Sequence, residues 1–142
     1  MSRTGLPAFD TTIDKTDHVL RQIEEAYGWP SDRRPQAYAA LRAVLHALRD
    51  RLPVEESAQL AAQLPMLLRG VYFEGWKPSK VPLKMSREEF LQRIRREFTY
   101  DIEGTTERLV KVVVQSLRDF ITDGEWDDVT STFPKDLAAV FA

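Results

Sequence analysis

The hydrophobic residues of this chain recur every three or four positions in several separate segments, which is the spacing of amphipathic helices. The first segment follows Thr16, its expected N-cap, and ends at Gly28. A second helix is predicted from about residue 36 to residue 52. Its apolar stripe is expected to face the core and its arginines to face solvent: Leu41, Val44, Leu45, Leu48 and Leu52 against Arg42, Arg49 and Arg51.

Two prolines divide the part of the chain that follows. Pro53 ends the second helix, and Glu55 and Glu56 occupy the first turn of a third, where carboxylates suit the positive end of the helix dipole. Because a residue before proline is disfavoured in the helical conformation, Leu64 is expected to end the third helix. Pro65 then begins a short fourth helix.

The same pattern returns after a linker over residues 76–85, which contains two prolines. Ser86 and Glu89 form a capping box, the residue pair that closes the first turn of a helix. The triplet "LRD" occurs at residues 48–50 and again at residues 117–119. The apolar stripe of the second helix also has its counterpart, in Val110, Val113, Val114, Leu117 and Ile121.

This repetition predicts a tandem duplication within a single domain, residues 1–142. Repeat one covers residues 16–75, the linker residues 76–85 and repeat two residues 86–142. A unit of about 60 residues buries little apolar area alone, so the two repeats are expected to pack about an approximate two-fold axis. The predicted fold is an all-α helical bundle without a sheet, each pseudo-symmetric repeat contributing three helices plus a short terminal helix.

Composition and charge exclude several classes of function. The 142 residues are 43% hydrophobic and 30% charged, which is typical of a soluble globular protein. A net charge of -2 gives no overall field to attract nucleic acid or an anionic membrane, and the absence of cysteine excludes disulfides and thiolate metal sites. Since no segment approaches the roughly 18 apolar residues of a membrane span, we expect a cytoplasmic protein without a membrane partner.

The run "AALRAVLHALRDRLPVEESAQLAAQLPMLLRGVYFEGWKP" resembles the bacterial domain-of-unknown-function (DUF) family 2267. "EFLQRI" and "FPKDLAAVF" are similar to the second half of that family, so the resemblance covers about residues 16–142. The second half departs more, with Phe133 and Lys135 where the first half has Leu64 and Met66. The resemblance implies a helical bacterial protein and provides no established catalytic residue to transfer to this sequence.

The duplicated pairs Arg49-Asp50 and Arg118-Asp119 are candidate ligand-binding residues, because outward-facing polar residues diverge after a duplication unless something retains them. In one interpretation the arginine caps helix C-terminal carbonyls and the aspartate accepts a hydrogen bond from the following turn. In the other, the two arginines flank the pseudo-axis and bind an anionic ligand. The structural interpretation is favoured, and both remain open.

His46 precedes Asp50 by four residues, a spacing that could orient a catalytic base or bring two metal ligands together. No third ligand lies nearby in the sequence, and Gln115 takes the place of His46 in the second repeat. A solvated or half-buried pair on a helix face is therefore favoured, and an enzyme that uses His46 and Asp50 is only the third hypothesis.

The acidic stretch "DFITDGEWDD", residues 119–128, invites comparison with a calcium-binding EF-hand loop. In that alignment Ile121 occupies the third position and Thr130 the twelfth, so the loop lacks its bidentate glutamate. Thr122 with Glu125 fits a capping box better. We therefore expect no metal, no cofactor and no catalytic residue.

The most basic stretch lies on the helix that begins the second repeat, where arginines with neighbouring aromatic residues could bind nucleic acid. The aromatic residues belong to the apolar stripe, and glutamates interrupt the positive charge, so a solvated face with internal ion pairs is favoured. We do not expect a nucleic-acid partner. The arginines concerned are Arg87, Arg93, Arg95 and Arg96.

The leading hypothesis is a non-catalytic protein that binds a protein partner or itself, and the alternative is a small anionic-ligand binding protein that uses the cleft between the repeats. Tyr72 and Trp76 are the candidate partner-binding residues, although Trp76 is favoured as a staple for the linker. A concave polar pocket near Arg49 and Arg118 would favour the ligand, and an exposed apolar patch around Tyr72 and Trp76 would favour the protein partner.

Overall fold

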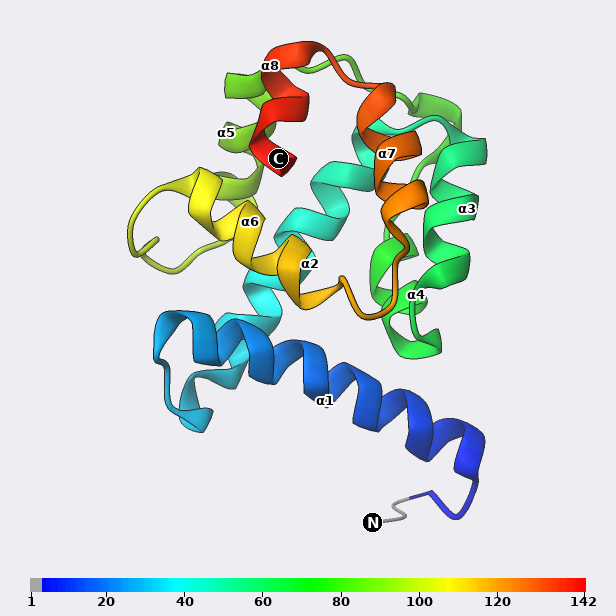
Figure 1. The fold of residues 1–142 in the computed structure, drawn as a ribbon, viewed down its shortest axis with the longest axis vertical. Helices are drawn as coiled ribbons and strands as arrows, with labels where there is room; N and C mark the ends of the chain where they lie inside the picture. The colour runs from blue at the N-terminus through cyan, green and yellow to red at the C-terminus, as the bar shows by residue number, and fades with distance from the viewer. Residues whose placement is uncertain (1–3) are drawn as a thin grey trace.

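The computed structural model describes residues 4–142, which form an all-α fold (Figure 1). The described residues contain eight α-helices and no strand, as the sequence predicts. Three short 3-10 helices, Ser31–Arg33, Pro78–Lys80 and Ala139–Phe141, lie in the connections and at the C-terminal end. The α-helices are α1 (Pro7–Tyr27), α2 (Arg34–Arg51), α3 (Val54–Gln63), α4 (Met66–Phe73), α5 (Arg87–Glu97), α6 (Thr106–Ser116), α7 (Asp123–Ser131) and α8 (Lys135–Ala138).

Helix α2 crosses the middle of the molecule and packs against α1, α4, α5 and α6 (Figure 1). The predicted apolar stripe is confirmed, because all five of its residues are completely buried. The opposite faces are also covered, since small side chains let the neighbouring helices approach closely. These small residues are Ala37, Ala40, Ala43 and Ala47.

The burial of most of the surface of α2 makes one prediction wrong. Arg49 was expected to face solvent, but only 8% of its surface is exposed. An amphipathic pattern identifies the most apolar face of a helix, whereas packing of α4 and α5 against the remaining faces depends on the tertiary fold. Arg42 and Arg51 are partly buried rather than fully exposed.

Helix α1 begins nine residues before the predicted N-cap. Thr16 lies inside the helix, where its hydroxyl donates a hydrogen bond to the carbonyl of Thr12 at 2.8 Å. The helix starts instead at Pro7, whose fixed φ suits the first helical position. Its first two turns hold few buried residues and therefore show no apolar periodicity, while its predicted end at Gly28 is confirmed by the left-handed φ of 68°.

Local signals placed several other helix ends correctly. The Ser86–Glu89 capping box is present with both of its hydrogen bonds, and α5 follows it. Leu64 ends α3 in an extended conformation, and Pro65 becomes the N-cap of α4, one residue from its predicted place. Among the described residues, none of the helices is long and apolar enough to cross a membrane.

Because α2 touches four other helices, truncation of its core residues should destabilise the whole fold. We predict that Leu45→Ala lowers the free energy of unfolding by about 2–5 kcal/mol, as expected when a completely buried leucine leaves a cavity. Urea denaturation followed by circular dichroism measures this change. Tyr38→Ala on the exposed side of the same helix serves as the control, and an equal loss in both variants would contradict the central role of α2.

Candidate functional site

A cluster of buried polar side chains lies where α2 meets the end of α4 and the start of the second half of the chain. Arg49 is at its centre and donates hydrogen bonds from Nη1 to the carbonyl of Tyr72 at 3.1 Å and to the carbonyl of Glu74. Carbonyls at a helix C-terminus have no partner within the helix. Arg49 therefore caps α4, a neighbouring helix rather than its own.

Asp50 connects α2 to α5 and to the linker. Its Oδ2 accepts hydrogen bonds from Arg93 at 2.7 and 3.2 Å, and its Oδ1 accepts one from Arg49 at 3.2 Å. Its backbone carbonyl accepts a further bond from the amide of Leu83 at 2.7 Å. Asp50 thus joins α2, the linker and α5, and its hydrogen bonds are made with Arg49, Arg93 and Leu83.

His46 is buried and contacts an acceptor through each ring nitrogen. Nδ1 lies 2.7 Å from a carboxylate oxygen of Glu97, and Nε2 lies 2.8 Å from the carbonyl of Val71. Both contacts can be hydrogen bonds at once only when both nitrogens carry protons. Burial acts to raise the pKa of Glu97, but the hydrogen bond and charge of His46, with the charge of Arg42, outweigh it and lower that pKa.

An open cleft of about 500 Å³ lies over this cluster, and a hollow of about 260 Å³ shares four of its residues. We call the two together the polar groove. It is bounded by α2, by the turn after α4, by the linker and by α5. Its residues are Arg42, His46, Arg49, Asp50, Glu74, Gly75, Lys77, Lys80, Val81, Leu83, Arg93, Arg96 and Glu97.

The polar groove is strongly basic. Six of its residues are lysine or arginine and three are aspartate or glutamate, in a chain whose net charge is -2. Arg42, Arg49 and Arg93 are held by carboxylates or carbonyls. Within residues 4–142, the exposed Lys77, Lys80 and Arg96 form no ion pair, so their charges are available to a ligand.

Arg118 and Asp119 lie outside the groove. Helix α6 ends at Ser116, so both residues fall in the following turn, where Arg118 reaches Asp123 at 3.4 Å and Asp119 lies 2.9 Å from Nε2 of His18. Arg118 lines a different hollow, beside Trp126 and Phe141. The structure therefore does not bring the two predicted Arg-Asp pairs together around one ligand.

Tyr72 and Trp76 belong to the interior more than to the surface. Tyr72 is completely buried, its hydroxyl lies 2.9 Å from that of Ser57, and burial raises its pKa. Trp76 is partly buried, and its ring packs on Phe73 with centroids 4.9 Å apart. This placement fits the interpretation of Trp76 as a linker staple.

Most of the arginines of α5 are ion-paired. Arg87 pairs with Glu107 at 2.7 Å, and Arg95 pairs with Glu88 at 2.9 Å. Arg93 belongs to the groove through Asp50. Of the four arginines in α5, Arg96 is the one without an ion-pair partner among the described residues, so its charge is available to a ligand.

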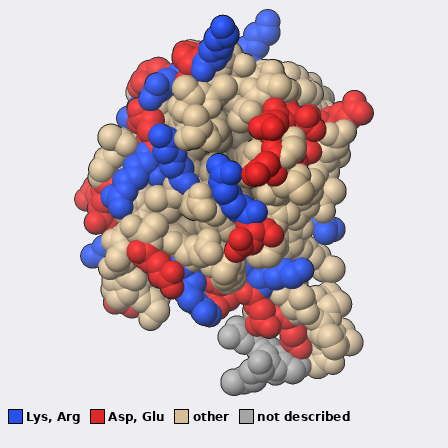
Figure 2. All heavy atoms as spheres, viewed as in Figure 1, with Lys and Arg blue, Asp and Glu red and all other residues tan. Residues whose placement is uncertain are grey.

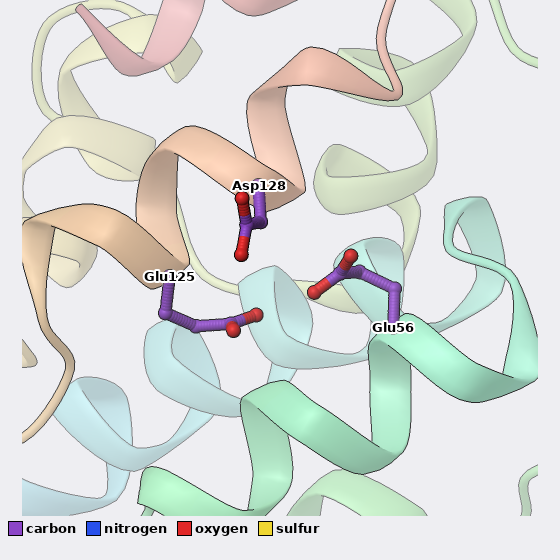
Figure 3. Close-up of side chains that lie close together, drawn as sticks. All are labelled: Glu56, Glu125 and Asp128. Carbon is purple, nitrogen blue, oxygen red and sulfur yellow. The ribbon is translucent and has the colours of Figure 1, made fainter.

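A second site, which the sequence did not reveal, is formed by Glu56 of α3 with Glu125 and Asp128 of α7 (Figure 3). One carboxylate oxygen from each residue lies within 4.8 Å of the others. Burial, followed by the neighbouring Glu56 and Asp128, raises the pKa of Glu125 to about 8. One feature of the sequence could have indicated this site, because Glu56 and Glu125 are both the third residue of their helices.

The capping box predicted for Thr122 and Glu125 is only half formed. The hydroxyl of Thr122 accepts the amide of Glu125 at 3.1 Å, as expected for an N-cap. The amide of Thr122, however, donates to the side chain of Gln63 at 2.9 Å rather than to Glu125. The carboxylate of Glu125 is therefore free to point toward Glu56.

The described fold is that of an all-α protein with a basic groove beside its central helix. A family model described as "Uncharacterized conserved protein (DUF2267)" matches residues 16–140, and the chain belongs to this family. A comparison with curated proteins finds no match.

We predict that Arg49→Lys lowers the free energy of unfolding by about 1.5–3 kcal/mol, because a single ammonium group cannot replace both the Nη1 bonds to the two carbonyls and the Nε bond to Asp50. The exposed Arg118→Lys provides the matched control and should change stability by less than about 0.5 kcal/mol. Chemical denaturation of both variants measures the difference. Equal effects would show that capping of α4 by Arg49 contributes little.

The low pKa of Glu97 predicts a dependence of stability on pH. Its ordinary value of 4.5 applies to the unfolded chain, so ionised Glu97 stabilises the fold above about pH 4.5 and this contribution disappears as the pH falls through the lower native value. We expect Glu97→Gln to be less stable at pH 7 by about 1–3 kcal/mol and to lose less stability on acidification. Thermal unfolding between pH 7 and pH 3 measures both effects.

The exposed Glu88→Gln on the same helix provides the control for this experiment. Its ion pair with Arg95 lies in solvent and contributes little, so its acid profile should follow that of the wild type. A Glu97→Gln profile parallel to the wild type would contradict the lowered pKa.

Proposed function

We propose that this protein is a non-catalytic binding protein whose polar groove binds a small anionic ligand. The observation that carries the proposal is the excess of basic over acidic residues in the groove, six against three, although the whole chain is slightly acidic. A concave surface with a local positive charge concentrates anions even when the net charge of the protein is negative.

The basic residues of the groove divide into a fixed set and an available set. Arg49 and Arg93 are held by hydrogen bonds to the helix end and to Asp50, so they keep the walls of the groove in place. Arg96 projects from α5, while Lys77 and Lys80 come from the linker. A planar guanidinium binds two oxygens of a phosphate or carboxylate, and lysines add point charges around it.

The proposal places the ligand between the two predicted repeats, residues 16–75 and residues 86–142. Similar helix starts support the duplication, because α4 and α8 both follow an N-cap proline in an extended conformation. The groove takes α2 and the end of α4 from the first repeat and α5 from the second. A ligand there would contact both repeats and the linker between them.

The state of the other polar groups supports binding rather than catalysis. His46 is the one imidazole in the groove, and both of its nitrogens already contact protein oxygens. Asp50 and Glu97 are likewise engaged by arginines. A general base requires a free lone pair within reach of its substrate, which these contacts do not provide.

A protein partner is the second candidate, favoured by exposed apolar side chains on two neighbouring helices. Phe9 of α1 and Met66 and Leu67 of α4 are each about half exposed, at 45%, 51% and 46%. The two helices pack together, and the amide of Leu67 donates to the hydroxyl of Thr12 at 2.9 Å. This surface, rather than Tyr72, is where a partner or a second copy would bind.

We predict that pyrophosphate binds the groove and that Arg96→Glu weakens this binding at least about tenfold, because the change replaces an available positive charge by a negative one. Isothermal titration calorimetry at low salt measures the affinity. Arg95→Glu on the same helix makes the same charge change outside the groove and should retain most of the affinity.

Two further results would decide between the candidates. Equal losses in the two variants, or no binding of pyrophosphate or citrate, would contradict an anion site in the groove. Native mass spectrometry of protein purified gently from cells should show an additional bound mass per chain. A clean dimer without bound mass would instead favour association through Phe9, Met66 and Leu67.

A further inference from the structure

The carboxylates of Glu56, Glu125 and Asp128 lie together without a positive side chain among the groups that shift the pKa of Glu125. By contrast, Asp17 and Glu24 both pair with Arg34. Figure 2 shows acidic side chains gathered over α7 on this face of the molecule. The cluster is therefore a place where negative charge is locally uncompensated.

Glu125 distinguishes this cluster from an ordinary acidic surface. Only 7% of the surface of Glu125 is exposed, and its Oε2 is buried without a hydrogen-bond partner among the described residues. The Oε2 of Glu56 is buried and unpartnered as well. An unpartnered buried carboxylate oxygen is costly, and Figure 3 shows the two glutamate side chains directed toward each other with Asp128 facing them.

Helix dipoles offset part of this charge. Glu56 and Glu125 are each the third residue of a helix, α3 and α7, and the positive ends of both helices therefore face carboxylates. Each helix end contributes roughly half an elementary charge. Two helix ends offset only part of the negative charge of three carboxylates, and a bound cation or a proton can offset the rest.

We propose that Glu56, Glu125 and Asp128 bind a calcium ion between α3 and α7. Carboxylate oxygens are hard ligands, which Ca²⁺ prefers. Ca²⁺ holds its ligands at about 2.3–2.6 Å, so it can contact oxygens that are up to 4.8 Å apart. Mg²⁺ demands a near-ideal octahedral shell at about 2.0–2.1 Å and gives up its water reluctantly, so three carboxylates from two helices suit it less well.

The surroundings of the cluster allow an ion to enter and to complete its coordination. Asp128 is exposed and Glu56 is partly exposed, whereas Glu125 forms the buried wall. Water can fill the remaining positions of a Ca²⁺ ion, which takes six to eight oxygens. An open site with three protein ligands should bind weakly, with a dissociation constant between about 10 µM and 1 mM.

Binding at this position would link the two halves of the chain. Glu56 comes from α3 and the other ligands from α7, and these helices pack against each other. A ligand that binds only the folded chain raises its stability according to its concentration relative to the dissociation constant. Ca²⁺ is therefore expected to raise the thermal midpoint, independently of any anion in the polar groove.

The test is titration of the metal-free full chain with CaCl₂ by calorimetry, together with thermal unfolding at the same concentrations. We expect one Ca²⁺ per chain and a rising thermal midpoint. Glu125→Gln and Glu56→Gln should each weaken binding at least about 100-fold, since even partners of metal ligands account for 10–100-fold. Circular dichroism verifies folding, and Glu125→Gln should fold without Ca²⁺ because the amide is neutral and nearly the same shape as the carboxyl group.

Neighbouring acidic residues supply matched controls. Glu55→Gln in α3 and Asp127→Asn in α7 remove the same charge from exposed positions outside the cluster and should leave Ca²⁺ binding within about threefold. Equal losses of Ca²⁺ affinity in the control variants would show that acidic residues attract the ion only in a general way, and would overturn the site. No binding at about 10 mM Ca²⁺, or tighter binding of Mg²⁺, would overturn the assignment of Ca²⁺.

Discussion

The fold depends on a central helix that is mostly buried and nevertheless carries charged residues. Arg49 and His46 of α2 have little contact with water, so each needs partners inside the protein. The end of α4 supplies carbonyls to both, at Val71, Tyr72 and Glu74. The requirement is mutual, because the carbonyls of Tyr72 and Glu74 at the end of α4 receive their hydrogen bonds from Arg49. Packing of α4 on α2 is thus fixed by polar as well as apolar contacts.

The same constraint determines where the polar groove can form. Glu97 faces His46 and Arg42, and Arg93 faces Asp50, so polar contacts attach α5 to α2. In these contacts the inner charged side chains of the groove are paired, whereas outer side chains such as Arg96 have no ion-pair partner among the described residues. A binding surface of this kind has walls that are already fixed and unpaired charges at its rim. Fixed walls reduce the free-energy cost of ordering side chains when a small anion binds.

Sequence reasoning succeeded where a single helix determines the outcome. The apolar stripe of α2, the capping box at Ser86 and the helix end at Gly28 depend on residues within a few positions of one another. It failed where a second element decides, as for Arg49, whose burial depends on α4. The start of α1 at Pro7 was missed because its first turns contribute few residues to the core.

The identical triplet at residues 48–50 and 117–119 shows why equal sequence did not imply an equal site. In the first copy the helix continues through the triplet, and α4 ends beside Arg49, while in the second α6 has already ended and Arg118 extends toward Asp123. Glu56 and Glu125 show the converse, because they sit at matching positions and do meet. Correspondence along a chain therefore identifies candidate pairs, and only the packing of the elements decides which of them form a site.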